Sequence, residues 1–195
     1  MKRVTCARIA VAVFFVVCLA SAASAMDFTF FIGGAIPGRL SAELAADPTG
    51  TLRDLQNGPI FGVRLNNSII PVIGLEHTLA FSPNYLTPES VLNPQKAHGF
   101  VYSTNLIVNI PIKKFVPYGT LGIGLIHQYG YADAPIGTKL AFNYGGGVKF
   151  ARLLGPLGLR FDMRGYRATG IPLISSKGGL NIFEASAGVF FSFGR

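Results

Sequence analysis

Cysteine is almost absent from this chain of 195 residues, and its two copies, Cys6 and Cys18, both lie within the first 25 residues. The remainder of the chain therefore has no disulfide bond and no cysteine-based metal site. After residue 25 no run of 18 apolar residues occurs, which excludes a transmembrane helix there. The mean hydropathy is nevertheless +0.44, so the apolar residues are spread over shorter segments. A small chain without disulfides gains its stability from an extensive core or from contact with lipid.

Acidic residues are scarce, and the basic residues do not gather in any one segment. Three of the 17 Lys and Arg residues and none of the 9 Asp and Glu residues precede residue 26, which leaves a net charge of +5 for the rest. The absence of a basic helix or an Arg-rich run argues against a nucleic-acid partner. No His, Asp or Glu pair has metal-ligand spacing, and 145–147, a run of three Gly, lacks the following helix and Lys of a phosphate loop. We therefore expect no metal and no cofactor.

The start of the chain has the three-part layout of a secretory signal peptide. Basic residues are followed by a short apolar core and by the small-residue cleavage site Ala23-Ser24-Ala25. A membrane anchor is excluded, because about 11 apolar residues do not cross a bilayer core that needs about 20. A lipoprotein signal is another alternative, but Val17 precedes Cys18 where such a signal requires a small residue. We expect a signal peptide over 1–25 and one mature domain over 26–195.

Eight segments of the remaining chain alternate apolar and polar residues, each near the roughly 9–11 residues that a tilted membrane strand needs. They span residues 27–37, 58–66, 72–83, 98–110, 115–129, 138–151, 157–168 and 183–193. The connections between them alternate between long and short. The short ones are 67–71, 111–114 and 152–156, and the longer ones, rich in Pro, Gly, Asn, Asp and Ser, are 38–57, 84–97, 130–137 and 169–182. A membrane β-barrel with both termini in the periplasm has this layout, with short periplasmic turns and longer external loops.

Each segment has one apolar face and one polar face. In 157–168, for example, Leu159 and Phe161 oppose Arg160 and Asp162. This pattern alone does not say which face points inward, but two observations favour a polar interior. Glycines share the polar face with long charged side chains, as the narrow interior of an eight-stranded barrel requires. Aromatic residues gather near both ends of the segments, as in the girdles of a membrane barrel, although Trp is absent.

These aromatic residues predict two belts, one at each rim of the barrel. The belt at the periplasmic rim is expected to contain Phe28, Phe30, Phe115, Tyr118, Phe150, Phe191 and Phe193. The belt at the external rim is expected to contain Phe81, Tyr85, Phe100, Tyr102, Tyr129 and Tyr131.

The last segment contains the pattern Ser186-x-Gly188-x-x-Phe191-x-Phe193, followed by two more residues. It resembles the C-terminal sorting signal by which the barrel assembly machinery receives outer-membrane β-barrels. The alternative is an edge strand of a soluble β-sandwich. The alternating apolar face of this segment, which includes Val189, suits contact with lipid.

Taken together, the signal peptide, the eight segments, the one-sided long loops and this ending resemble the small eight-stranded outer-membrane barrels. These are the OmpA-transmembrane-domain-like and OmpX-like proteins, grouped as outer membrane protein β-barrel domain families. The resemblance implies an all-β fold, an eight-stranded antiparallel up-and-down transmembrane β-barrel. It also implies localisation in the outer membrane and contact with outer-membrane lipids and lipopolysaccharide. The chain departs from the pattern by adding Gly194 and Arg195 after the last aromatic residue, and it lacks a peptidoglycan-binding domain.

Charged residues on the proposed inner face predict a polar network that fills the lumen. Because a buried charge must be paired, we expect these side chains to form ion pairs with one another. Arginines at 160 and 164 flank the carboxylate at 162, and their forked donors suit carboxylates. The expected network consists of Arg64, Glu76, Lys149, Arg160, Asp162, Arg164 and Glu184. A catalytic or ion-conducting site is the alternative reading of the same residues.

Catalysis would need a nucleophile beside a base, and the three histidines do not supply that pairing along the chain. His77 and His127 have no Ser two residues later, and His98 lies next to a glycine. We therefore expect no catalytic residue. Three functions remain open: a structural or surface-interaction barrel whose external loops contact partners, a narrow transporter for small or apolar solutes, and a lipid A-modifying enzyme. The sequence favours the first and does not identify the surface partner.

Overall fold

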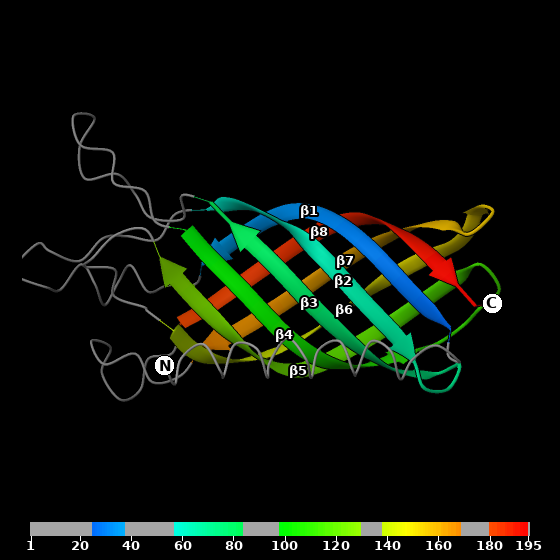
Figure 1. Ribbon diagram of the computed structural model, residues 1–195, viewed down its shortest axis with the longest axis horizontal. Coiled ribbons are helices and arrows are strands. Elements are labelled where there is room, and N and C mark those ends of the chain that lie inside the picture. The colour runs from blue at the N-terminus through cyan, green and yellow to red at the C-terminus, as the bar shows by residue number, and fades with distance from the viewer. Residues whose placement is uncertain (1–24, 38–56, 84–97, 130–137, 169–179, 195) are drawn as a thin grey trace, which may run out of the picture.

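The computed structural model of the chain describes residues 25–37, 57–83, 98–129, 138–168 and 180–194. They form a closed barrel of eight antiparallel strands that follow one another in chain order (Figure 1). The strands are β1 (Met26–Pro37), β2 (Gly58–Ser68), β3 (Ile73–Ser82), β4 (His98–Asn109), β5 (Phe115–Tyr129), β6 (Thr138–Leu154), β7 (Leu157–Ala168) and β8 (Leu180–Phe193). The predicted fold class is confirmed.

The first and last strands close the barrel. β1 pairs with β8 in antiparallel register, from Met26 opposite Phe193 to Pro37 opposite Ile182. Each strand therefore has a hydrogen-bonded neighbour on both sides, and the sheet has no open edge. The strand boundaries agree with the predicted segments to within a few residues. The largest differences are in β6, which continues to Leu154 through a register shift, and in β8, which begins at Leu180.

The three short connections lie at one end of the barrel, beside the C-terminal end of β8 (Figure 1). We call this end the turn end. The strand ends that the four longer connections join lie at the opposite end, which we call the loop end. The predicted alternation of short and long connections is therefore confirmed, although most residues of the long ones lie outside the described ranges.

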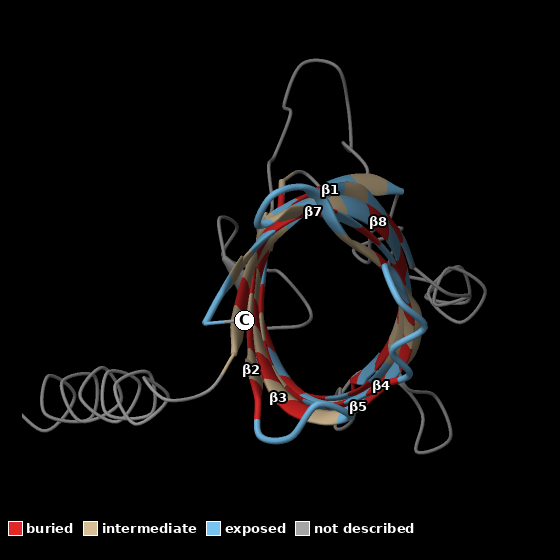
Figure 2. Cartoon of the chain, turned by 90° about the vertical axis from the view of Figure 1, so that its right-hand side faces the viewer, coloured by how far each residue is buried: buried red, intermediate tan, exposed pale blue. Residues whose placement is uncertain are grey.

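Burial alternates along the strands, so one face of each strand points into the barrel and the other points outward. In β7, Arg160 and Asp162 are buried, whereas Phe161 and Met163 are 46% and 60% exposed. A view along the barrel shows the strands as a closed ring (Figure 2). The polar face is the inner face, as predicted, and the outer face is apolar. Such an outer face suits acyl chains, because apolar surface is costly to expose to water.

The described residues contain no helix that is long and apolar enough to cross a membrane.

Glycines on the inner face leave room for large neighbouring side chains. A Cβ atom added at Gly147 would lie 2.6 Å from the Tyr118 hydroxyl, and one added at Gly122 would collide with the Asn105 side chain. In contrast, Gly119 faces outward, and a Cβ there would meet no atom within 4 Å. The inner glycines therefore match the narrow interior expected of eight strands.

Aromatic side chains form clusters on the outer face near each end of the strands. At the turn end, the rings of Phe115 and Phe150 lie 5.5 Å apart, and those of Phe191 and Phe193 lie 4.9 Å apart. The prediction for Tyr118 is wrong, because its side chain points into the lumen and is 6% exposed. The reason is strand periodicity, since Tyr118 is an odd number of residues from the outward-facing Phe115.

At the loop end, the Phe61 and Phe81 rings lie 5.4 Å apart, and the His98 ring stacks on Phe81 at 5.6 Å. Tyr85, Tyr131 and the Tyr129 side chain, which we predicted for this belt, lie outside the described residues.

Candidate functional site

The barrel lumen holds a cluster of buried charges on the inner faces of five strands. All seven predicted network residues lie there, and each is at most 4% exposed. Together with Asp27, which sequence reasoning did not include, they make four buried cations and four buried carboxylates. This balance fits the rule that a charge removed from water needs an opposite charge beside it.

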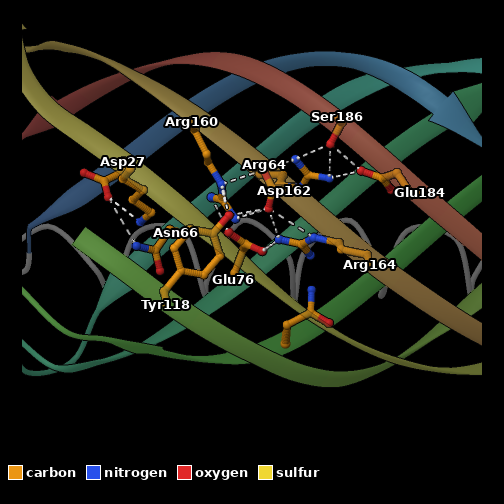
Figure 3. Close-up of polar contacts among 12 residues, drawn as sticks. Asp27, Arg64, Asn66, Glu76, Tyr118, Arg160, Asp162, Arg164, Glu184 and Ser186 are labelled. Carbon is orange, nitrogen blue, oxygen red and sulfur yellow. Dashed lines mark hydrogen bonds and ion pairs between the residues drawn. The ribbon is translucent and has the colours of Figure 1, made fainter. Parts of the chain in front are cut away.

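Asp162 on β7 is the centre of the cluster (Figure 3). Arg64 and Arg160 each donate to its carboxylate at 2.9 Å, and Arg164 donates at 3.0 Å. Arg160 uses two nitrogens, so this contact is bidentate. The Tyr118 hydroxyl also donates to Asp162 and accepts a hydrogen bond from Arg160 at 2.9 Å. One carboxylate therefore joins three arginines and a tyrosine.

Glu76 on β3 reaches across the lumen to the opposite wall. Its two carboxylate oxygens form ion pairs of 2.5 Å with Arg160 and with Arg164, both on β7. In the ring of eight strands, β3 and β7 are separated by three strands on either side. These ion pairs therefore connect two strands that share no backbone hydrogen bond.

Glu184 on β8 is the third carboxylate of this cluster. It forms an ion pair with Arg64 and accepts hydrogen bonds from the Tyr166 hydroxyl at 2.8 Å and the Ser186 hydroxyl at 2.6 Å. The Arg64 guanidinium also lies 3.6 Å from the centre of the Phe31 ring, within the range of a cation–π contact. Both charged groups thus have several partners.

Lys149 on β6 belongs to a separate, smaller group nearer the turn end. Its ammonium forms a 3.0 Å ion pair with Asp27 on β1. Asp27 also accepts hydrogen bonds from Asn66 at 3.3 Å and Ser192 at 2.7 Å. The structure thus brings six of the seven predicted residues into one cluster and places Lys149 in another.

The predicted network leaves out several residues that complete the two groups: Asp27, Asn66, Tyr118, Tyr166 and Ser192. The signal that would have found them is strand periodicity. Asn66, Tyr166 and Ser192 have the same parity as a predicted charge on their own strand, such as Tyr166 two residues after Arg164. Asp27 and Tyr118 are an odd number of residues from Phe28 and Phe115, which were predicted to face outward.

The loop-end half of the lumen is apolar, in contrast to the polar network that we predicted for the lumen. Buried hydrophobic side chains from seven strands pack together there, and the partly buried Ile182 on β8 packs against them. The buried members are Phe31, Ala35, Ile60, Ala80, Val101, Ile126, Ala141, Tyr166 and Ala168. The lumen therefore changes from charged at its middle to apolar near the loop end.

The histidines make contacts across strands that the order of residues along the chain does not reveal. His77 faces outward on β3, and its Nδ1 lies 3.1 Å from the Thr104 hydroxyl and 3.3 Å from the Tyr102 hydroxyl on β4. His127 Nδ1 lies 2.6 Å from the Thr138 hydroxyl. A catalytic triad needs a third group, usually a carboxylate, to orient the histidine. All four carboxylates that the structure describes are buried in the lumen.

No cluster of His, Cys, Asp and Glu side chains suited to hold a metal ion occurs within the described ranges.

The residues of the predicted C-terminal assembly signal occupy β8, next to the closing strand β1. Ser186 points inward to Glu184. Gly188 also lies on the inner side, where a Cβ would crowd the side chains of Thr29 and Phe31. Phe191 and Phe193 face outward at the turn end.

Several solved structures resemble this barrel over most of its length. Neisserial surface protein A superposes with a TM-score of 0.62 at 14% identity, over 87% of this chain and 97% of that chain. The outer membrane protein OprG from Pseudomonas aeruginosa superposes with a TM-score of 0.58 at 12% identity, over 89% of this chain and 97% of that chain. Ail of Yersinia pestis, in complex with the heparin analogue sucrose octasulfate, superposes with a TM-score of 0.54 at 15% identity, over 87% of this chain and 99% of that chain.

No protein-family model matches the sequence, and no curated protein matches it. At 12–15% identity the resemblance to solved structures concerns the fold. It agrees with the closed ring of eight antiparallel strands. The chain has the fold of the small eight-stranded outer-membrane β-barrels.

Proposed function

We propose that this protein is an integral outer-membrane β-barrel with a structural or surface-interaction role in the cell envelope, and that its lumen is plugged. One observation carries the proposal: the buried charges lie inside the barrel, and most of the large apolar side chains that the structure describes face outward. Ile32, Ile123 and Met163, for example, are 66%, 59% and 60% exposed. A water-soluble barrel has the opposite arrangement, because its apolar residues fill the interior.

In this orientation the turn end faces the periplasm and the loop end faces outward. Residues 1–25 are removed as a signal peptide, and the assembly machinery recognises the end of β8. Outer-membrane lipids and lipopolysaccharide surround the barrel. The external connections over 39–57 and 84–97 contact a surface partner. The complex of Ail with a heparin analogue supports such a role, since it is a protein of this fold that carries a ligand.

A plugged lumen disfavours the alternative of a narrow pore. The ion pairs between Glu76 and β7 cross the middle of the lumen, and the apolar cluster occupies the loop-end half. A permeating ion would have to separate buried ion pairs and then cross an apolar zone, and both steps are unfavourable. An enzyme acting on lipid A is disfavoured because neither His77 nor His127 has a serine two residues later along its strand.

Planar-bilayer recordings on the chain from Met26, folded in detergent and then reconstituted, test this proposal. Protection of the strands from protease in matched vesicles first establishes insertion. We expect an inserted barrel without steady conductance. Steady ohmic conductance from protected barrels would overturn the plug but not the membrane location. A monomeric, folded chain in buffer without detergent would overturn the membrane location itself. Mass spectrometry of lipid A with and without the protein tests for an enzyme, and we expect identical spectra.

A further inference from the structure

The turn end of the barrel exposes aliphatic side chains on all three hairpins. Figure 2 looks onto this end and shows the turns as exposed. Scattered exposed aliphatic residues are ordinary, but several gathered at one end indicate a surface that contacts another apolar phase or molecule. The two most exposed on each hairpin have exposed fractions between 46% and 76%: Ile69, Ile70, Ile110, Ile112, Leu153 and Leu154.

Among the described residues, the exposed charged side chains at this end are all basic. Lys113, Lys114 and Arg152 lie on two of the hairpins and are all exposed. The carboxylates that the structure describes are buried in the lumen, where they contact arginines and Lys149. The described part of the turn end is therefore positively charged, with cations placed among aliphatic side chains.

The backbone supplies a second, independent observation about these cations. Lys113 and Arg152 have φ values of 57° and 55°, and they are the two non-glycine residues with positive φ in the described ranges. Lys113 is the first central residue of a two-residue hairpin closed by hydrogen bonds between Ile112 and Phe115, a position where glycine is usual. Arg152 lies within the register shift of β6, where a left-handed residue is again usually glycine.

A cation at a left-handed position costs conformational free energy that glycine would avoid. Residues held in such conformations tend to mark functional positions. Both strained positions carry a long basic side chain, and both lie on the same exposed surface. This coincidence indicates that the charge is retained for contact with something outside the barrel.

We propose that the turn end binds anionic phospholipids of the periplasmic leaflet. The aliphatic side chains sink into the boundary between head groups and acyl chains, and the three cations contact lipid phosphates, as in other interfacial segments. The aromatic belt supports a position of these hairpins at the head-group boundary, where aromatic side chains gather. Phe115 directly follows Lys114, and Phe150 precedes Arg152 by two residues. The aliphatic residues favour a lipid over free phosphate. The inference rests on the proposed membrane location.

Lipid retention in native mass spectrometry tests the proposal. The chain from Met26 is folded into nanodiscs of phosphatidylcholine that contain some phosphatidylglycerol, and the lipids that stay bound after release are counted. We expect phosphatidylglycerol to be enriched over its share of the nanodisc. Lys113→Gly and Arg152→Gly should each lower this enrichment about fivefold, the effect of one basic residue near an anionic surface.

The glycine variants separate lipid binding from folding. Glycine suits a positive φ, so both variants should be at least as stable as the parent in urea. Lys113→Arg keeps the charge and should keep the enrichment. Arg167→Gln removes an exposed cation at the loop end, and this variant should leave the enrichment of phosphatidylglycerol unchanged. Equal losses in Arg167→Gln and Lys113→Gly, or full enrichment in both glycine variants, would overturn the proposal. Displacement of the lipid by inorganic phosphate would also overturn it.

A depth measurement gives a second test on the folded barrel. Because no cysteine follows residue 25, Leu154→Cys provides a single site for an environment-sensitive dye. We expect a quencher attached to lipid near the head groups to reach this dye and aqueous iodide to reach it poorly. The reverse result would contradict the proposal. If protease protection shows insertion while the lipid tests fail, only this inference is wrong. If insertion itself fails, the proposed function is wrong as well.

Discussion

Asp27 on β1 and Lys149 on β6 form a buried ion pair of 3.0 Å that stands apart from the main charge cluster of the lumen. In the sheet, Lys149 lies directly opposite Arg160 on β7. Two neighbouring cations repel one another, and each therefore needs its own carboxylate. Asp27 satisfies Lys149, while Asp162 and Glu76 satisfy Arg160.

Asp27→Asn should destabilise the folded barrel by about 3–5 kcal/mol, because it leaves the Lys149 ammonium buried beside Arg160 without a counter-charge. The measurement is urea unfolding of the refolded chain in lipid vesicles, followed by heat-modifiable gel mobility. The double variant Asp27→Asn, Lys149→Met removes both charges and should recover part of the loss. A single variant as stable as the parent would show that the pair does not stabilise the fold.

Glu76→Lys should be more damaging, because it places a fourth cation among three arginines. We expect a loss above about 3–5 kcal/mol, the cost of an unpaired buried charge, or failure to fold. Glu76→Gln keeps the shape and serves as the milder variant. A double-mutant cycle between Glu76→Gln and Arg164→Met measures the coupling across the lumen. Full stability of Glu76→Lys would contradict the network.

Gly147→Ala should destabilise the barrel by about 1–3 kcal/mol, because the new methyl group would press on the Tyr118 hydroxyl and the neighbouring strand. Gly119→Ala on the outer face is the matched control, since a Cβ there has no neighbour within 4 Å. The comparison uses urea midpoints in the same vesicles. Equal midpoints for the two variants would show that the lumen is less tightly packed than the structure indicates.

Ile123→Arg tests which medium surrounds the outer face. The side chain is 59% exposed near the middle of β5, where an arginine facing lipid costs about 2–4 kcal/mol. Asn181→Arg, exposed near the loop end of β8, should cost about 0–1 kcal/mol, because the cost falls toward the interface. Unfolding in vesicles gives both values. A negligible effect at Ile123 would indicate that water, and not lipid, contacts this face.

Strand number and strand boundaries follow from the sequence because side chains alternate between faces with a period of two. The same rule identified the inner charges, including Arg160 and Glu184, from local pattern alone. The same period of two places Tyr118 inside the barrel, where it is buried, and not in the outer belt that we predicted for it. Asp27 is absent from the predicted network for a different reason. It is the only charged residue of β1, so its segment shows no group of charges on one face.

Partners across the lumen were not predictable, because they depend on how the strands close. Glu76 and Arg164 are 88 residues apart, and no local pattern relates them. The contact between His77 and Thr104 depends on the register of β3 against β4. The left-handed conformations of Lys113 and Arg152 likewise result from hairpin geometry, and the local sequence does not predict them.

The order of residues by itself determined that eight segments alternate, that long and short connections alternate with them, and that the charges share one face. These are local properties, since a strand has a fixed period and a turn has a fixed length. Closure of the ring decided the rest: which charges meet across the lumen, and where the lumen becomes apolar. Those contacts join strands distant in the chain, and only the register of the closed barrel brings them within bonding distance.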